Sequence, residues 1–215
     1  LSSSSAASDV YKRQTQKQAN VDGRSPNTIA ASTFSDEMII ASNGKAKVFG
    51  ISVKDRGAVA MAGHGGKALW FSKTTQEFVS SSYYFDQYPQ WLNNWNAQKL
   101  PHAYSNKSWN LLNPKSSYMF AEHDDNAWEA DIGGYGRTFP HPFGDKSSPY
   151  FSTLLTINPI GDELTANLAK ALIINESIGK DDITDYLAIS FSSTDYIGHF
   201  YGMSSLESED NLLRL

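Results

Sequence analysis

The feature that most constrains the fold of this chain is the run DYLAISFSS at residues 185–193, which is nearly continuous in apolar character. A strand with one face in water alternates apolar and polar residues, whereas a continuous apolar run is typical of a strand covered on both faces. Such strands occur in parallel sheets whose faces carry helices. The run therefore predicts a buried strand in an α/β domain.

Further strands and helices are expected in alternation along the chain, as an α/β fold requires. KVFGISV at residues 47–53 is a short strand candidate rich in apolar and β-branched residues. Residues 67–84 fit two short strands with a Lys-Thr-Thr turn between them. Together with residues 185–193, these segments are the expected strands.

Helical patterns occupy other segments of the chain. Ser35 is the expected cap of a first helix, which Asn43-Gly44 ends. A short amphipathic helix is expected at residues 88–99. The clearest helical spacing covers residues 161–178, and residues 205–215 begin like another helix but stop without a Gly or Pro.

The chain also suggests how its parts are organised. The Ser-rich leader at residues 1–14 is expected to be foreign to the domain or disordered. Residues 15–215 are expected to be part of a single domain that continues in a longer protein. Residues 101–150 lack periodicity and are rich in Pro, Gly, His, Asn and aromatics, so we expect an irregular, cap-like insertion with some structure of its own.

Composition argues against several classes of protein. The 215 residues carry a formal net charge of -5 with both signs mixed, and no basic stripe indicates a nucleic-acid surface. No apolar stretch reaches the roughly 18 residues typical of a membrane span. The chain contains no cysteine, which excludes disulfides and thiolate metal sites.

Asp195 and His199 form the first candidate site, four residues apart and just after the apolar run. In a helical turn, side chains at this spacing lie on one face. Aspartate oxygen and histidine nitrogen are ordinary zinc ligands, with bonds of roughly 2.0–2.2 Å. The pair is therefore a candidate part of a zinc site, although a chance surface pair is the commoner origin of this spacing.

A catalytic zinc usually takes three protein ligands. The remaining histidines, His64, His102, His123 and His141, occur in no second motif of this kind. His64 follows Gly63 and is better explained as a turn or packing residue. We therefore expect at least one partner of Asp195 and His199 to lie beyond residue 215.

Lys54 and Arg56 form the second candidate site, directly after the strand at residues 47–53. In an extended segment, alternate residues point to the same side. A lysine point charge beside a forked guanidinium suits the oxygens of a phosphate group. The alternative is a solvated strand end at which Asp55 balances the charge.

The five tryptophans leave a further alternative open. They could line a sugar site. One alternative hypothesis is therefore a non-catalytic glycan-binding module that uses the aromatic-rich middle of the chain. Burial in a core is the simpler expectation for such side chains. The residues are Trp70, Trp91, Trp95, Trp109 and Trp128.

Several segments, taken in order, resemble one known family. They are FSDEMIIASNGKAKVFGISVKDRGAVAMAGHGGKALWFS, FVSSSYYFDQYPQWLNNWN, DELTANLAKALI and DYLAISFSSTDYIGHFYG. The same order is found in bacterial alkaline phosphatases of the type I phosphodiesterase/nucleotide pyrophosphatase group, in the alkaline phosphatase superfamily. The resemblance runs from about residue 22 to the C-terminus.

The resemblance implies a partial three-layer α/β/α sandwich from a two-zinc hydrolase of small phosphate esters. In that family a Thr or Ser nucleophile forms a covalent phosphoenzyme, which water then hydrolyses. Asp195 and His199 match ligands of one zinc, and Lys54 and Arg56 match a Lys-x-Arg pair that contacts the phosphoryl oxygens. Two cations at the transferred group favour a monoester over a diester, because the monoester carries one more negative charge.

Other parts of the family pattern have no match in this chain. The nucleophile, its metal-binding Asp and a phosphate-holding Asn are expected upstream, and a later Asp-His pair and a final His downstream. We therefore expect weak zinc affinity and no appreciable turnover from these 215 residues alone. A nucleotide phosphodiesterase/pyrophosphatase is the first alternative, and a sulfatase or phosphonate hydrolase of the same superfamily is another. The resemblance also implies a periplasmic or secreted protein.

Overall fold

The structure, a computed structural model, describes residues 23–215, so the predicted leader at residues 1–14 lies outside the described residues. The chain divides into two compact units. Unit 1 comprises the chain up to residue 99 together with residues 165–190, and unit 2 comprises residues 100–164 and 191–215. Among residues 23–215, no helix combines the length and the apolar character needed to cross a membrane.

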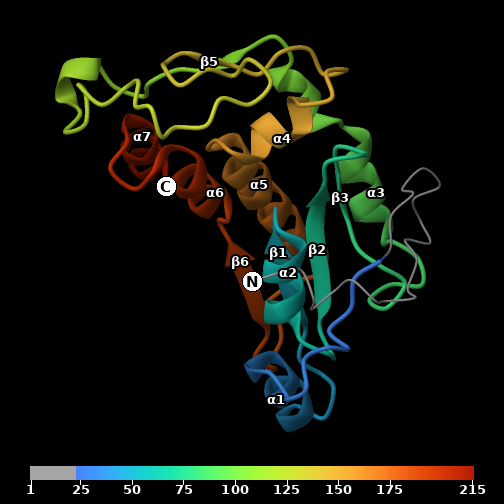
Figure 1. Ribbon diagram of the computed structural model, residues 1–215. Helices are drawn as coiled ribbons and strands as arrows, with labels where there is room; N and C mark the ends of the chain where they lie inside the picture. The colour runs from blue at the N-terminus through green and yellow to red at the C-terminus, as the bar shows by residue number, and fades with distance from the viewer. Residues whose placement is uncertain (1–22) are drawn as a thin grey trace. The chain divides into compact units, whose positions relative to one another are not determined.

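Unit 1 is built on a four-stranded sheet in the order β3-β2-β1-β6 (Figure 1). β1 pairs in parallel with both β2 and β6, whereas β3 is antiparallel to β2. This mixed sheet with its helices confirms the predicted α/β class and each predicted strand region. The strands are β1 (Val48–Ser52), β2 (Lys67–Ser72), β3 (Glu77–Val79) and β6 (Tyr186–Ser190).

Helix α2 (Asp55–Ala62) connects β1 to β2 and packs on both strands. Gly50 permits this close approach, because a Cβ atom there would lie 2.3 Å from the carbonyl oxygen of Ala58. The resulting βαβ unit brings the carboxyl end of β1 to the start of α2. Ligands of α/β proteins bind at this edge of the sheet.

The other helices of unit 1 are α1 (Phe34–Ala41), α3 (Gln90–Ala97) and the part of α5 (Ile160–Asn175) from Thr165 onward. Helix α3 protects the edge strand β3, since the Asn96 side chain accepts the N–H of Phe78 at 3.1 Å and donates to its carbonyl at 2.8 Å. These two bonds satisfy backbone groups that an edge strand would otherwise leave unpaired.

The predicted cap of α1 is wrong by two residues. Thr33 is the N-cap: its hydroxyl accepts the N–H of Asp36 at 3.2 Å, and the Asp36 carboxylate accepts the N–H of Thr33 at 2.8 Å. Ser35 is buried in the first turn, where its hydroxyl donates to the carbonyl of Met61. Threonine and serine both cap helices well. The reciprocal hydrogen bonds between Thr33 and Asp36 identify Thr33 as the cap.

Strand β6 is less buried than its apolar run predicts. Ala188 is buried, and the other four residues of the strand are half-buried. Within the described residues, β6 ends the strand order and pairs with β1 alone. A strand that has one neighbour keeps its other edge open, so the apolar composition does not produce full burial here.

Unit 2 surrounds a mainly aromatic core formed by Trp109, Tyr135, Phe143, Phe151, Ile197 and Tyr201, among others. Residues 101–150 contribute short elements and irregular chain. These elements are the 3-10 helices η1 (Leu100–Tyr104) and η2 (Lys115–Ser117) and the antiparallel strands β4 (Ser108–Trp109) and β5 (His141–Pro142). Helices α4 (Phe151–Thr156), α6 (Ser193–Tyr201), α7 (Leu206–Arg214) and the start of α5 complete the unit.

Two buried acidic residues of α7 tie the irregular region to this core. Glu207 lies 3.0 Å from the imidazole of His141, and both side chains are fully buried. Asp210 accepts the indole N–H of Trp109 at 2.6 Å and the backbone N–H of Leu112 at 2.7 Å. Polar contacts to α7 thus hold a segment whose own sequence has no regular pattern.

Candidate functional site

A group of cationic side chains lies at the carboxyl edge of the sheet in unit 1. Lys54 is the last residue before α2, Arg56 lies in the first turn of that helix, and Lys73 directly follows β2. β1 and β2 run in parallel with Ser52 opposite Trp70, so the carboxyl ends of the two strands are neighbours. The sequence indicated Lys54 and Arg56 as candidates. The pairing of β1 with β2 adds Lys73 to the same edge of the sheet.

The extended geometry expected for residues 54–56 is wrong. Lys54 has extended backbone angles, but α2 begins at Asp55 and Arg56 is already helical. Asp55 suits the start of a helix because its negative charge faces the positive end of the helix dipole. The N–H of Lys54 donates to the hydroxyl of Ser52 at 3.0 Å, which holds the turn between strand and helix.

Burial and neighbouring like charges both act on Lys54 at this edge of the sheet. The pKa of Lys54 lies below its usual range, first because the side chain is partly buried and then because Arg56 and Lys73 carry like charges. Asp55, the expected counter-charge, is engaged elsewhere: its carboxylate accepts from the Arg24 side chain at 2.6 Å and from the N–H of Arg56 at 2.8 Å. A bound anion would lower the electrostatic free energy of these cations.

Asp195 and His199 lie on helix α6 of unit 2, as their spacing predicts. The other face of α6 enters the core, where Ile197 and Tyr201 are fully buried. Asp195 and His199 therefore stand on the outer face, with 54% and 74% of their side chains exposed. Gly202, at φ +88°, ends the helix directly after Tyr201.

The geometry of this pair fits a shared zinc ion. Nε2 of His199 lies 3.5 Å from Oδ1 of Asp195. Two ligands about 2.1 Å from one tetrahedral ion are about 3.4 Å apart, so the side chains need little movement to bind together. No group of three or more His, Cys, Asp or Glu residues suited to a metal occurs within residues 23–215, so the pair supplies at most part of a ligand set.

Two of the other histidines have structural partners. His64 forms an ion pair with Asp36, at 2.8 Å between Nδ1 and the carboxylate, which agrees with the packing role expected for it. His141 is buried against Glu207. Both rings are therefore occupied by contacts that fold the protein.

Most of the tryptophans also serve packing. Trp70, Trp95 and Trp109 are buried, whereas Trp128 is 70% exposed. The indole N–H of Trp95 donates to Asn167 at 2.8 Å. The simpler expectation of burial therefore accounts for three of the five candidate sugar-binding residues.

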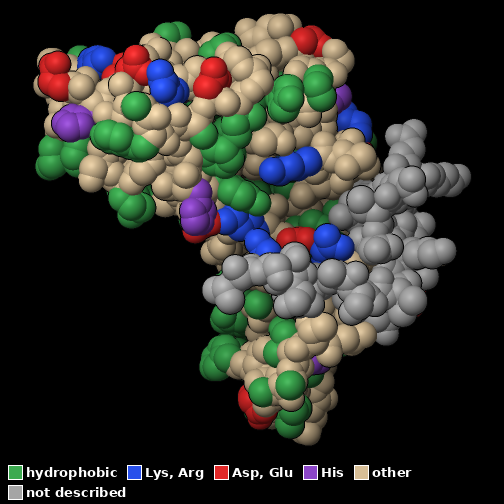
Figure 2. All heavy atoms as spheres, in the orientation of Figure 1, with side chains coloured by type: hydrophobic (Ala, Val, Ile, Leu, Met, Phe, Trp, Pro, Cys, Tyr) green, Lys and Arg blue, Asp and Glu red, His purple; other side chains and the backbone are tan. Residues whose placement is uncertain are grey.

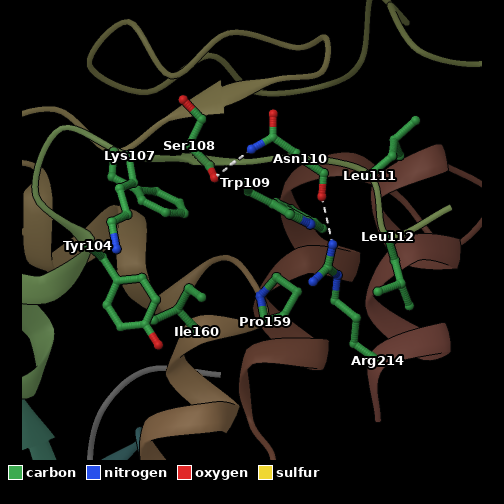
Figure 3. A pocket seen from close by; sticks show the side chains of 11 residues that line it. Tyr104, Lys107, Ser108, Trp109, Asn110, Leu111, Leu112, Pro159, Ile160 and Arg214 are labelled. Atoms are coloured by element: carbon green, nitrogen blue, oxygen red, sulfur yellow. Dashed lines mark hydrogen bonds between the residues drawn. The ribbon is translucent and has the colours of Figure 1, made fainter. Parts of the chain in front are cut away.

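A pocket of about 310 Å³ lies in unit 2. Figure 3 shows Lys107 and Arg214 on opposite sides of it, with Ile160 between them. Arg214 donates to Asp210 at 2.7 Å and to the carbonyl of Asn110 at 2.6 Å, so its guanidinium already holds protein oxygens. None of the four predicted site residues lines this pocket.

The predicted site residues thus form two pairs, one in each unit. Lys54 and Arg56 belong to unit 1, and Asp195 and His199 to unit 2. On the face drawn in Figure 2, basic and acidic side chains are interspersed, as the mixed composition suggests.

Besides Lys73, the sequence pattern did not indicate Asp162, a buried carboxylate whose Oδ1 accepts the N–H of Ser193 at the start of α6. Its position in a first helical turn gave no signal of that contact.

Comparisons with known proteins point to one family. The family profile described as type I phosphodiesterase / nucleotide pyrophosphatase matches residues 8–215. Alkaline phosphatase PhoV of Synechococcus elongatus is 39% identical over 193 residues, which cover 89% of this chain and 35% of that protein. Alkaline phosphatase PafA of Elizabethkingia meningoseptica is 37% identical over 199 residues, covering 91% of this chain and 36% of that protein.

A solved structure of a PafA variant has the same fold, with a TM-score of 0.86 at 34% identity over 98% of this chain and 41% of that one. The variant carries four substitutions, including a lysine and an arginine, two positions apart, that are both replaced by alanine. The alignments with PhoV and PafA given above show that this chain spans little more than a third of the length of each of these two relatives.

Proposed function

Because the chain belongs to the type I phosphodiesterase / nucleotide pyrophosphatase family of the alkaline phosphatase superfamily, we propose that it is part of an enzyme that hydrolyses phosphate esters. The more specific proposal is a zinc-dependent phosphomonoesterase. The relatives named above are called alkaline phosphatases, and this name supports the class of reaction. The residues of this chain support the finer assignment in the ways that follow.

The observation that carries the proposal is the group of cations at the end of β1. Burial, and then the like charges of Arg56 and Lys73, lower the pKa of Lys54. A bound anion would offset the repulsion among these three cations. A phosphoryl group offers several oxygens to a guanidinium fork and an ammonium group. The paired alanine substitutions in the PafA variant have the same Lys-x-Arg spacing, which supports a shared role.

In this role, Lys54 and Arg56 bind and orient the non-bridging oxygens of the ester. Negative charge on these oxygens is held by donors that are already in place, and such preorganised donors lower the activation barrier. A monoester dianion gains more from two cations than a diester monoanion does. We therefore propose a preference for monoesters, and a nucleotide phosphodiesterase/pyrophosphatase remains the alternative within the family.

Asp195 and His199 are the residues of this chain that would hold zinc, as their 3.5 Å separation allows. When bound, zinc supplies Lewis-acid stabilisation of oxygens on the phosphoryl group. Asp195 contributes a negative charge that attracts the cation, and His199 contributes a neutral nitrogen donor. Further ligands and the nucleophile are proposed to come from other parts of a longer protein.

The test uses that longer protein, produced with zinc, and compares p-nitrophenyl phosphate with bis(p-nitrophenyl) phosphate. We expect kcat/KM for the monoester to exceed that for the diester by at least tenfold. A preference for the diester would replace the monoesterase assignment by the phosphodiesterase alternative. Hydrolysis of neither ester by a folded, zinc-loaded protein would contradict the proposal as a whole.

A further inference from the structure

Helix α6 lacks the usual hydrogen bond at its own start. The side chain of Ser192, its N-cap residue, makes no capping hydrogen bond. The first amide groups of a helix have no partner within the helix and need acceptors from elsewhere. This helix carries Asp195 and His199, so whatever holds its first turn also influences where those two side chains point.

The missing acceptor comes from helix α5. Oδ1 of Asp162 accepts the N–H of Ser193 at 3.0 Å, although the two residues are 31 positions apart. Asp162 is only 3% exposed and lies in the first turn of α5. Its other oxygen, Oδ2, has no hydrogen-bond partner among the described residues. The carboxylate thus remains buried beside α6 although only one of its oxygens is satisfied there.

A second contact holds the same turn from helix α7. The Asn211 side chain donates to the hydroxyl of Thr194 at 2.8 Å, and Asn211 is 1% exposed. Ser193 and Thr194, the two residues held by these contacts, directly precede Asp195. Both contacts lie within unit 2, as does α6 itself.

We infer that Asp162, together with Asn211, is a positioning residue that sets the orientation of the Asp195–His199 pair toward zinc. This inference rests on the metal role proposed above for that pair. Asp162 accepts an N–H at the first turn of α6 and Asn211 donates to a hydroxyl one residue later, so each restrains a different group. Loss of either contact frees the turn that precedes Asp195, whereas the buried Ile197 and Tyr201 still anchor the helix.

The test measures binding of Zn²⁺ alone to the longer protein proposed above, by competition with a chromophoric chelator, and the visible absorption of bound Co²⁺. Outer contacts that orient metal ligands typically contribute about 10–100-fold to affinity. We expect Asp162→Ala and Asn211→Ala each to weaken Zn²⁺ binding at least tenfold and to change the Co²⁺ spectrum. Each variant is measured well below its own melting temperature.

Asp162→Asn is the conservative variant, because its amide oxygen can still accept the N–H of Ser193. It should keep Zn²⁺ affinity within about threefold of the parent chain. If only the loss of the buried charge mattered, Asp162→Asn and Asp162→Ala would change the affinity equally. Asp125→Asn makes the same chemical change at an exposed position of unit 2 and should leave both readouts unchanged. If Asp162→Ala does not fold, the Zn²⁺ affinities of Asn211→Ala and Asp162→Asn are compared with that of the parent chain instead.

His199→Ala separates the two ways in which the idea can fail. If His199→Ala loses Zn²⁺ binding while both Asp162→Ala and Asn211→Ala bind like the parent, the positioning role is wrong and the metal pair stands. If His199→Ala binds Zn²⁺ like the parent chain, the metal assignment is wrong and the positioning role falls with it. Equal losses in Asp162→Ala and Asp162→Asn would also overturn the positioning role.

Discussion

Oδ1 of Asp195 and Nε2 of His199 lie 3.5 Å apart on the exposed face of α6, whereas Ile197, between them in sequence, is fully buried on the opposite face. This relationship follows from the helical period, which places positions i and i+4 together and position i+2 on the other side. The core contact of Ile197 fixes which face is turned outward. The same packing that stabilises unit 2 therefore presents the proposed ligands to solvent.

Removal of metal should abolish the proposed activity. In the longer protein we expect a chelator to eliminate hydrolysis of p-nitrophenyl phosphate and added Zn²⁺ to restore it. Asp195→Ala should lower kcat/KM at least about 100-fold, because one of a small set of ligands is lost. Asp182→Ala, at an exposed position, is the matched control. Activity of Asp195→Ala within threefold of the parent protein would contradict the metal role.

The cations of unit 1 should matter more for a monoester than for a diester. We expect Lys54→Ala/Arg56→Ala to reduce kcat/KM for p-nitrophenyl phosphate by about 10²–10³-fold or more, the range seen when one preorganised donor is lost. The bis ester should lose less. Lys170→Ala removes an exposed lysine of unit 1 and should have little effect on either substrate. An equal loss for both esters would argue against selection by charge.

Burial of Asp162 should make stability depend on pH. Burial raises its pKa to about 6 from an ordinary value of 3.8, in spite of the hydrogen bond from Ser193. The folded state therefore binds a proton more tightly than the unfolded state, and stability falls as pH rises between these values. The shift corresponds to roughly 3 kcal/mol, which Asp162 costs the folded state above pH of about 6.

Asp162→Asn removes this titration. Its free energy of unfolding should exceed that of the parent chain at pH 7, and the difference should shrink as the pH falls toward 4. Urea unfolding at several pH values measures both quantities. A difference that is constant from pH 4 to pH 7 would show that the pKa of Asp162 is not raised in the folded protein.

The Asp36–His64 pair should depend on pH in a different range. The hydrogen bond from His64 to Asp36 raises the pKa of the imidazole above 6.5. The stability that protonated His64 contributes is fully present below pH of about 6.5 and is lost as pH rises through the higher folded-state pKa. The parent chain should therefore lose stability relative to His64→Gln on going from pH 6 to pH 9.

Urea midpoints for the parent chain, His64→Gln and the exposed-site control His123→Gln test this expectation. Because the His64 side chain is 36% exposed, solvent screens the ion pair and the effect should be small. Parallel curves for the parent chain and His64→Gln would show that the charge of His64 does not contribute.

Asp210 should be one of the most sensitive positions of unit 2. Its fully buried carboxylate accepts from the Trp109 indole, the Leu112 N–H and the Tyr118 hydroxyl, and it pairs with Arg214. Asp210→Ala leaves these donors without an acceptor and should lower the free energy of unfolding by about 3 kcal/mol or more. Denaturant unfolding measures this change, and a loss below about 1 kcal/mol would contradict it. Asp182→Ala again serves as the exposed control.

The alternation of strands and helices could be read from the sequence because apolar periodicity is a local property. The strands β1 and β6 and the helix α5 lie where their patterns predict them. Local sequence could not decide between Thr33 and Ser35 as a helix cap, since the reciprocal bond with Asp36 exists only once the helix has formed. It also could not show that, among the described residues, β6 pairs with β1 alone.

For the candidate site, the sequence by itself determined the types and spacing of the chemically active groups. Asp195 and His199 share a helical face because four residues make about one turn, and this holds in any α-helix. Tertiary structure alone decided which groups surround them. Lys73 joins Lys54 through strand pairing, and Asp162 reaches Ser193 across 31 residues. Such contacts depend on which elements pack together, and the burial of apolar surface across the whole unit settles that packing.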